Sequence, residues 1–358
     1  MAVMYGKTKR FKLNEEFQTA KGPIKFLRYI ETEENQPKVE YIYTNTGATE
    51  IDYYGVVYYK VLKYHKKLGI PQPESVKYKY KVETNRPLKY GVELELVVPS
   101  QMRLKRELEA NGIKVIMPNV VHEVTEGAWK IVYDGSIRAP RGFEGCELVS
   151  PPSTDFKELE IVCKVLSEVG AKVNTSCGLH VHHEIKDLKR QQIIRIYEFY
   201  HKYEKLIDLM HSKHRENNKY CKTLRYIIDT VRECDTKEKL LTKIAGKLQR
   251  SYYASCRYYK LNLRSYLNYG TLEFRQSDAS IKFEDVSNWI MFTHKIVERG
   301  TRINCDIEQF DWEEEIHFNA NPVSKYEEMM KDLGIYWLTD EYKMYDKKVN
   351  KNRARVTA

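Results

Sequence analysis

The sequence of 358 residues predicts an α+β fold, in which helices pack on the back of an antiparallel sheet. Apolar residues make up 42% of the chain and charged residues 31%, which is typical of a folded globular protein. From about residue 89, short segments alternate between apolar and polar residues with a period of two, as strands with one buried face do. Long amphipathic segments lie between these strands and indicate the helices.

The expected elements follow one another along the chain. Strands are predicted at residues 90–98, 129–134, 144–149, 178–185, 257–266 and 270–276. Helices are predicted at residues 53–68, 102–111, 155–169, 187–211, 236–249 and 283–299. Asp155 and Asp235 stand where the N-caps of two of these helices are expected. Gly69 and the two prolines at 71 and 73 end the first helix.

The sequence pattern changes near residue 85, which predicts a domain boundary there. Residues 1–85 are expected to form a basic, tyrosine-rich N-terminal segment of unknown role, ending in an extended connector. Residues 86–305 form the large α+β domain. Residues 306–342 are expected to pack on that domain as a C-terminal extension, and residues 343–358 form a basic tail.

The positive charge is concentrated at the two ends of the chain. The formal net charge is +10, and residues 1–88 carry +6 of it while residues 343–358 carry +5. The body between them has a net charge of −1. Nucleic acid is therefore an unexpected partner for the core domain, and the basic termini are the places where an acidic partner could bind.

Composition also argues against membrane and secreted classes of protein. No stretch approaches 18 uninterrupted apolar residues, and the N-terminal residues lack the apolar run of a signal peptide. The seven cysteines are odd in number and never spaced as C-x-x-C, which indicates free thiols in a reducing compartment. We expect a cytoplasmic protein with no membrane partner.

Two predicted strands carry pairs of side chains that can bind metal. Glu93 and Glu95 share one face of their strand because side chains repeat every two residues, and paired carboxylates suit hard cations such as Mg²⁺. His180 and His182 share a face in the same way, with His183 pointing the other way, outside the expected site. Each pair alone also fits an ordinary half-exposed strand.

A third strand places Glu273 and Arg275 on one face. The pair fits a simple salt bridge, but an arginine there also suits a site where phosphate charge must be neutralised. Arg257, Asn262 and Arg264 add donors just upstream.

Two turns end neighbouring strands in the same region. Asp134 begins a D-G-S turn and Glu147 lies near the end of a strand, where sites are often built. The D-G-S sequence alone is also typical of a plain tight turn. The sequence has no P-loop, no dinucleotide-binding glycine motif and no nucleophile elbow. Phosphate chemistry here would use metals and arginines on a sheet.

The chain resembles the amidoligase family of bacteria and phages through an ordered series of segments. These are YGVELEL, DGSI, GCELVSPP, NTSCGLHVHHEI, HSKHRENNKYC, RYYKLNL and YGTLEFRQ, spread over about residues 89–300. That family looks like a branch of the glutamine-synthetase-like carboxylate–amine ligases. The resemblance implies a curved antiparallel sheet whose concave face holds ATP and Mg²⁺ or Mn²⁺. It also implies that a carboxylate is activated as an acyl phosphate and joined to an amine.

The resemblance also assigns roles to individual residues. The implied metal ligands are Glu93, Glu95, Glu147, His180 and Glu273. The residues implied to contact the nucleotide phosphates or the substrate are His182, Arg215, Arg257 and Arg275. The residues implied in catalysis are Glu273, Arg275 and Asp134, of which Asp134 would bind or deprotonate the incoming amine. The substrates would be a small-molecule or peptide carboxylate and an amine.

Two other functions remain open at this point. The chain could be a catalytically silent ligase fold that uses its basic ends to hold an acidic partner. It could also be a metal-dependent hydrolase that activates water with the histidines and carboxylates. The arginines and the absence of an H-E-x-x-H helix make the hydrolase the weaker of the two.

Overall fold

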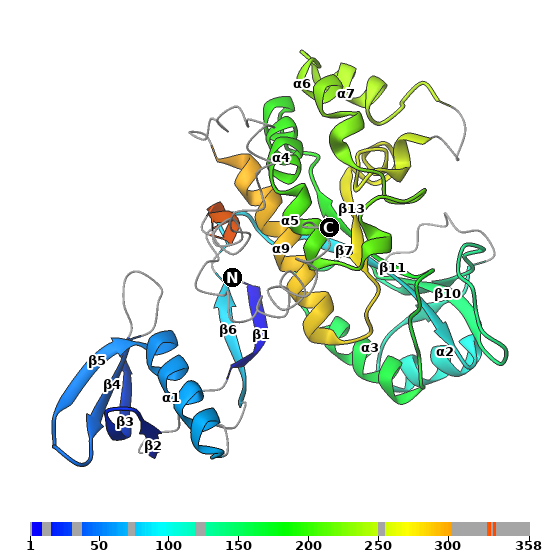
Figure 1. Ribbon diagram of the computed structural model, residues 1–358. Coiled ribbons are helices and arrows are strands. Elements are labelled where there is room, and N and C mark those ends of the chain that lie inside the picture. The colour runs from blue at the N-terminus through cyan, green and yellow to red at the C-terminus, as the bar shows by residue number, and fades with distance from the viewer. Residues whose placement is uncertain are drawn as a thin grey trace. The chain divides into compact units, whose positions relative to one another are not determined.

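The computed structural model describes residues 2–8, 16–30, 38–70, 76–82, 84–118, 127–249, 255–302, 328–330 and 332–333 (Figure 1). The chain divides into two compact units, and each is described by itself. The smaller unit contains residues 5–79 and 337–341, and the larger unit contains residues 1–4, 80–336 and 342–358. The basic tail at 343–358 and most of the extension at 306–342 lie outside the described residues.

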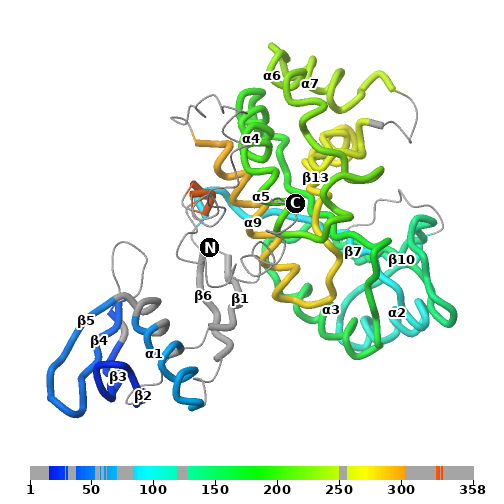
Figure 2. The backbone as a smooth tube through the Cα atoms, viewed as in Figure 1, coloured from blue at the N-terminus to red at the C-terminus, as the bar shows by residue number. Residues whose placement is uncertain are grey.

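The smaller unit is a four-stranded antiparallel sheet followed by one helix (Figure 2). Its strands run in the order β2 (Glu16–Thr19), β3 (Gly22–Ile30), β4 (Lys38–Tyr43) and β5 (Thr49–Tyr53), and α1 (Tyr54–Leu68) follows. The helix was predicted and the four strands were not. Their inward residues, which include Phe17, Phe26 and Tyr41, form a core with Val57 and Val61 of α1. β1 (Ala2–Thr8) and β6 (Val76–Val82), the expected connector, form a separate two-stranded sheet.

The larger unit contains a seven-stranded sheet in the order β12-β13-β11-β7-β10-β9-β8. All of its pairs are antiparallel except β8 and β9, which run parallel, so the expected antiparallel sheet is mixed at this one edge. The strands are β7 (Tyr90–Val98), β8 (Val115–Ile116), β9 (Trp129–Val132), β10 (Glu144–Val149), β11 (Gly178–Glu184), β12 (Leu261–Asn262) and β13 (Thr271–Asp278).

The helices of the larger unit connect these strands. Their bounds are α2 (Gln101–Ala110), α3 (Lys157–Glu168), α4 (Arg190–Lys202), α5 (Glu204–Met210), α6 (Ile228–Arg232), α7 (Lys237–Lys243), α8 (Ser265–Tyr269) and α9 (Phe283–Thr301). Three short 3₁₀ helices are η1 (Lys213–Arg215), η2 (Leu224–Tyr226) and η3 (Ser255–Tyr258). Helix α9 packs against β11, and α3 and α4 pack against α9. In Figure 1, α4 and α9 lie side by side. No helix in the described part of the chain has the length and apolar character needed to cross a bilayer.

Several local predictions were wrong. Asp155 is not an N-cap, since Phe156 lies at the N-cap position of α3, and the helix expected at 236–249 ends at Lys243. The helix expected at 187–211 is broken at Tyr203, whose hydroxyl is held by Glu328 and Asp332. The strand expected at 257–266 is reduced to β12, because the Asn262 side chain accepts a hydrogen bond from the backbone N–H of Arg264 and turns the chain into α8. Asp235 is not an N-cap, since Thr236 caps α7 instead.

The two faces of the large sheet differ in chemistry. On the helix-covered face, Leu94, Val181 and Phe274 are almost fully buried. His183 points to this side, where its Nε2 lies 2.8 Å from the Thr293 hydroxyl of α9. The opposite face carries the polar members of the same strands. Because burial of the apolar face fixes the register, it also fixes which polar side chains meet on the other face.

Candidate metal centre

The strand register places the predicted carboxylates and imidazoles in adjacent rows. His180 of β11 lies opposite Glu93 of β7, and Glu147 of β10 lies opposite Glu95 of β7. On the other side, His182 of β11 lies opposite Glu273 of β13. Four neighbouring strands therefore contribute to one polar patch on the sheet.

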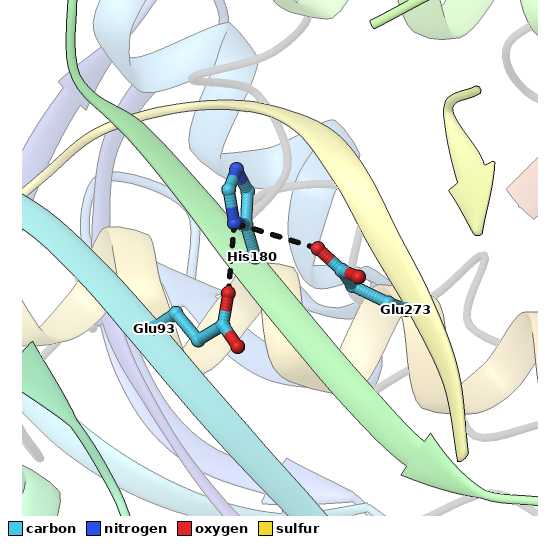
Figure 3. A group of neighbouring side chains, drawn as sticks. All are labelled: Glu93, His180 and Glu273. Atoms are coloured by element: carbon cyan, nitrogen blue, oxygen red, sulfur yellow. Dashed lines mark hydrogen bonds and ion pairs between the residues drawn. The ribbon is translucent and has the colours of Figure 1, made fainter. Parts of the chain in front are cut away.

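Figure 3 shows the first group, which consists of Glu93, His180 and Glu273. The Nδ1 atom of His180 lies 3.0 Å from a Glu93 oxygen and 3.5 Å from a Glu273 oxygen. One ligand atom from each residue lies within 4.8 Å of the other two. His180 and Glu273 are buried, while Glu93 is partly exposed. Two carboxylates and one imidazole at these separations match the ligand types of Mg²⁺ or Mn²⁺.

A second group lies on the other side of the same imidazole. Its members are Glu95, Glu147 and His180, and their ligand atoms again lie within 4.8 Å of one another. The Nε2 atom of His180 lies 3.6 Å from a Glu95 oxygen. A neutral imidazole has only one nitrogen with a free lone pair, so His180 can ligate one ion at a time. An ion in the other group would then be held by carboxylates and water.

The pKa shifts differ between the two sides of the patch. Burial, together with the nearby Glu93 and Glu95, raises the pKa of Glu147 well above its ordinary value. Burial would also raise the pKa of Glu93, but His182 and His180 outweigh it and lower the pKa well below its ordinary value. Glu93 in turn raises the pKa of His182, against the effect of burial. The pKa is thus lowered at Glu93, beside the imidazoles, and raised at Glu147, whose charged neighbours are carboxylates.

His182 lies between Glu93 and the edge of the site. Its Nε2 lies 3.1 Å from a Glu93 oxygen and its Nδ1 lies 3.0 Å from the Thr271 hydroxyl. The ring meets Tyr269 edge-on, with 6.3 Å between the ring centroids. Both nitrogens are therefore engaged by partners within the protein.

Arg275 forms the positive end of the patch. Its guanidinium donates to Glu273, and this contact lowers the pKa of Glu273 although burial opposes the shift. The other Glu273 oxygen accepts a hydrogen bond of 2.5 Å from the Asn262 amide. The Arg275 Nε donates to the Tyr220 carbonyl at 3.3 Å. These contacts fix Arg275 beside the first group.

The other predicted arginines lie in different surroundings. The buried Arg215 donates to the backbone carbonyls of Arg275 and Gln276, so two of its nitrogens hold β13 in place. A Cβ atom at Gly178 would lie 2.8 Å from the Arg215 guanidinium, which explains the glycine there. Arg257 lies in η3, with its guanidinium over the Tyr258 ring at 5.6 Å.

Asp134 lies in the turn that the sequence predicted. Its carboxylate accepts a 2.7 Å hydrogen bond from the backbone N–H of Ser136, and it is close enough to Glu147 to raise the pKa of that residue further. Asp134 is half-buried and belongs to neither group of metal-binding atoms. It stands beside the acidic side of the patch.

Two contributors were missed by the sequence analysis. Thr271 lies two residues before Glu273 on the same strand, so the two-residue repeat could have placed it on the site face. Tyr220 contributes a backbone carbonyl, and no sequence pattern marks such a contact.

A known protein family matches the segment of the chain that carries this patch. The family described as "putative amidoligase enzyme" matches residues 86–297, which is more than half of the chain. The chain belongs to this family. The match spans all seven strands of the large sheet and every residue of the two metal-binding groups. A comparison with curated proteins finds no match.

We expect the patch to bind a divalent cation that stabilises the folded protein. At a Mg²⁺ or Mn²⁺ concentration of about 100 times Kd, the free energy of unfolding should rise by about 2.7 kcal/mol. Glu93→Gln and Glu273→Gln should lose most of this gain. Glu184→Gln is the matched control, because Glu184 lies on β11 but pairs with Lys89 outside both groups. Thermal unfolding with metal titration measures the effect, and equal gains in all variants would contradict it.

The raised pKa of Glu147 predicts a pH dependence. Without metal, the stability that the protonated carboxyl contributes is present at low pH and is lost as the pH rises through the raised pKa. Metal needs the ionised carboxylate, so metal-induced stabilisation should grow as the pH rises from acidic values through the raised pKa of Glu147. Glu147→Gln should flatten both trends. Melting temperatures across this range, with and without Mn²⁺, test it; a pH-independent metal effect in the unmodified protein would refute it.

Proposed function

We propose that the protein is an ATP- and Mg²⁺-dependent ligase that joins a carboxylate to an amine through an acyl phosphate. Family membership supports a ligase at the level of the family. The observation that carries the finer proposal is the single sheet face that holds Glu93, His180, Glu273 and Arg275 together (Figure 3). We further propose that this sheet is of the glutamine-synthetase-like type and that residues 86–305 form the catalytic domain.

The charge distribution supports phosphate binding. ATP brings about four negative charges, which carboxylates alone would repel. Glu93, Glu95, Glu147, His180 and Glu273 would hold Mg²⁺, which when bound would supply positive charge against the charge of the transferred phosphoryl group. Arg275 stands at the end of the patch with its guanidinium already held by Glu273 and Tyr220, so it can face the phosphates without reorganising.

The proposed reaction has two steps. In the first, an oxygen of the donor carboxylate attacks the γ-phosphorus, and the bond to the β-phosphate oxygen breaks to release ADP. In the second, the amine nitrogen attacks the acyl carbon and inorganic phosphate leaves. The amine must lose a proton in this step, and we propose Asp134 as the base because its carboxylate borders the acidic side of the patch.

The proposed reaction also implies classes of substrate and a cellular location. The acyl donor would be a peptide, an amino acid or a cell-wall fragment, and the acceptor a primary amine. His182, Arg257 and Arg215 are proposed to act on the phosphate side, with Arg215 acting through the backbone of β13. A cytoplasmic location fits this activity, since ATP is supplied there and the six described cysteines are free and buried.

Phosphate release from ATP tests the proposal directly. With Mg²⁺ or Mn²⁺ and a pooled panel of amino acids, peptides and amines, we expect release that depends on the panel. Glu93→Gln and Arg275→Lys should each lower kcat by about 10²–10³-fold, since each removes a fixed charge or its geometry at the phosphates.

Glu184→Gln serves as the control for general damage to β11 and should keep full activity. Panel-dependent release in the unmodified protein that survives Glu93→Gln would refute the assignment of the site. An absence of both turnover and ATP binding would instead favour a silent scaffold.

A further inference from the structure

A network of buried polar side chains lies next to β13, outside the metal-binding groups. Its centre is Lys260, whose side chain is fully buried. The Lys260 ammonium lies 2.5 Å from an Asp208 oxygen and 2.8 Å from a Glu204 oxygen, and both acids come from α5. A buried cation with two carboxylates is not a strong source of stability, because desolvation offsets most of the attraction. Such a network instead fixes the positions of the groups that it joins.

Two further side chains connect this network to β13 and α4. The Gln276 amide donates to the same Asp208 oxygen that binds Lys260. The Tyr200 hydroxyl of α4 donates to Oε1 of the Gln276 side-chain amide at 2.5 Å. Tyr200 and Gln276 are both fully buried. Gln276 can therefore take one orientation only, with each end of its amide matched to a partner.

A β-bulge lies where the network meets the candidate site. The pairing of β11 with β13 shifts by one residue between Leu179 and Val181, opposite Arg275 and Gln276. Bulges redirect side chains. Here Arg275 points to Glu273 while Gln276, the next residue, points to Asp208. Arg275 of the candidate site and Gln276 of the network are thus the two residues that lie in this bulge.

The same network also holds the segment from His211 to Leu224. Glu204 accepts a hydrogen bond of 3.0 Å from the backbone N–H of Leu224. The backbone N–H of Lys260 donates to the Lys222 carbonyl at 3.0 Å, and the Lys260 carbonyl accepts from the backbone N–H of Arg275 at 2.9 Å. This segment carries the Tyr220 carbonyl that binds the Arg275 Nε.

We propose that Tyr200, Glu204, Asp208, Lys260 and Gln276 form a positioning network that sets the place of Arg275 through the 211–224 segment and the bulge in β13. None of these five side chains is part of either metal-binding group, and their contacts lie within the protein interior. The inference rests on the proposed function in one respect, namely that Arg275 acts on phosphate. Its structural half, the ordering of residues 211–224, stands independently of any reaction.

Tyr200→Phe is the most conservative test, because it removes one hydroxyl and keeps the ring. The matched control is Tyr197→Phe, since Tyr197 is equally buried on the same helix and its hydroxyl donates to the Leu261 carbonyl at 3.3 Å, outside the network. Lys260→Met removes the buried ammonium at the centre of the network. It is the stronger perturbation of the network, provided that the variant folds.

Two readouts separate the parts of the proposal. The first is hydrogen–deuterium exchange of peptides covering residues 211–224, which requires no activity. We expect faster exchange in Tyr200→Phe than in Tyr197→Phe. The second is steady-state kinetics, in which Tyr200→Phe should lower kcat by about tenfold or more and leave the KM for ATP nearly unchanged, because a displaced catalytic group slows the chemical step.

The outcomes are distinct. Equal exchange in the two variants would overturn the proposal, whatever the activity of the protein. Faster exchange with kcat unaltered in an active enzyme would also overturn it, since the network would then have only a structural role. Faster exchange in a chain that never turns over ATP would support the ordering of the segment and would count against the proposed function instead.

Discussion

The central constraint on this structure is the mutual repulsion of carboxylates that are withdrawn from water on one face of a sheet. Glu93, Glu95, Glu147 and Glu273 come from three adjacent antiparallel pairs and converge on one imidazole. Charges so close together are tolerated only when positive groups lie between them or when a carboxyl takes up a proton. The structure shows both responses, with His182 beside Glu93 and a raised pKa at Glu147. A bound divalent cation would resolve the same conflict.

The rest of the fold serves to hold this unfavourable arrangement in place. The apolar face of the sheet packs against α9 and α4, and that burial fixes the strand register. Since register is fixed on one face, the polar residues on the other face cannot slide apart. The alternation of side chains along β13 then places Arg275 on the site face and Gln276 on the interior face. Burial of apolar side chains on one face of the sheet thus fixes the positions of the polar side chains on the other face.

The sequence allowed each pair of residues to be found on its own strand. It did not show how pairs on different strands contact one another. A period of two placed Glu93 with Glu95, His180 with His182 and Glu273 with Arg275, because that rule is local. The contact of Glu93 with His180 joins residues 87 positions apart, and it depends on strand order. The resemblance to the amidoligase family assigned these residues to one site, which the local rule could not do. The family match at 86–297 agrees with that resemblance.

Other features could not be predicted from the spacing of residues along a strand or helix. Arg215 was expected at a phosphate, yet its hydrogen bonds hold the backbone of β13, a role that only the folded arrangement reveals. The strands of the smaller unit were missed although β2 and β4 alternate buried and less buried residues, which is the pattern that the period-two rule detects. The buried position of Lys260 could not be foreseen either, since lysine is rarely found in a core.

The most direct test of this account is a crystal structure of the protein grown with Mn²⁺, with anomalous scattering used to locate the ions. The account predicts an anomalous peak coordinated by Glu93, His180 and Glu273, or by Glu95, Glu147 and His180, at distances near 2.1–2.2 Å, as is usual for oxygen and nitrogen ligands of such ions. A well-ordered sheet face with no peak at either group, at saturating Mn²⁺, would contradict the account.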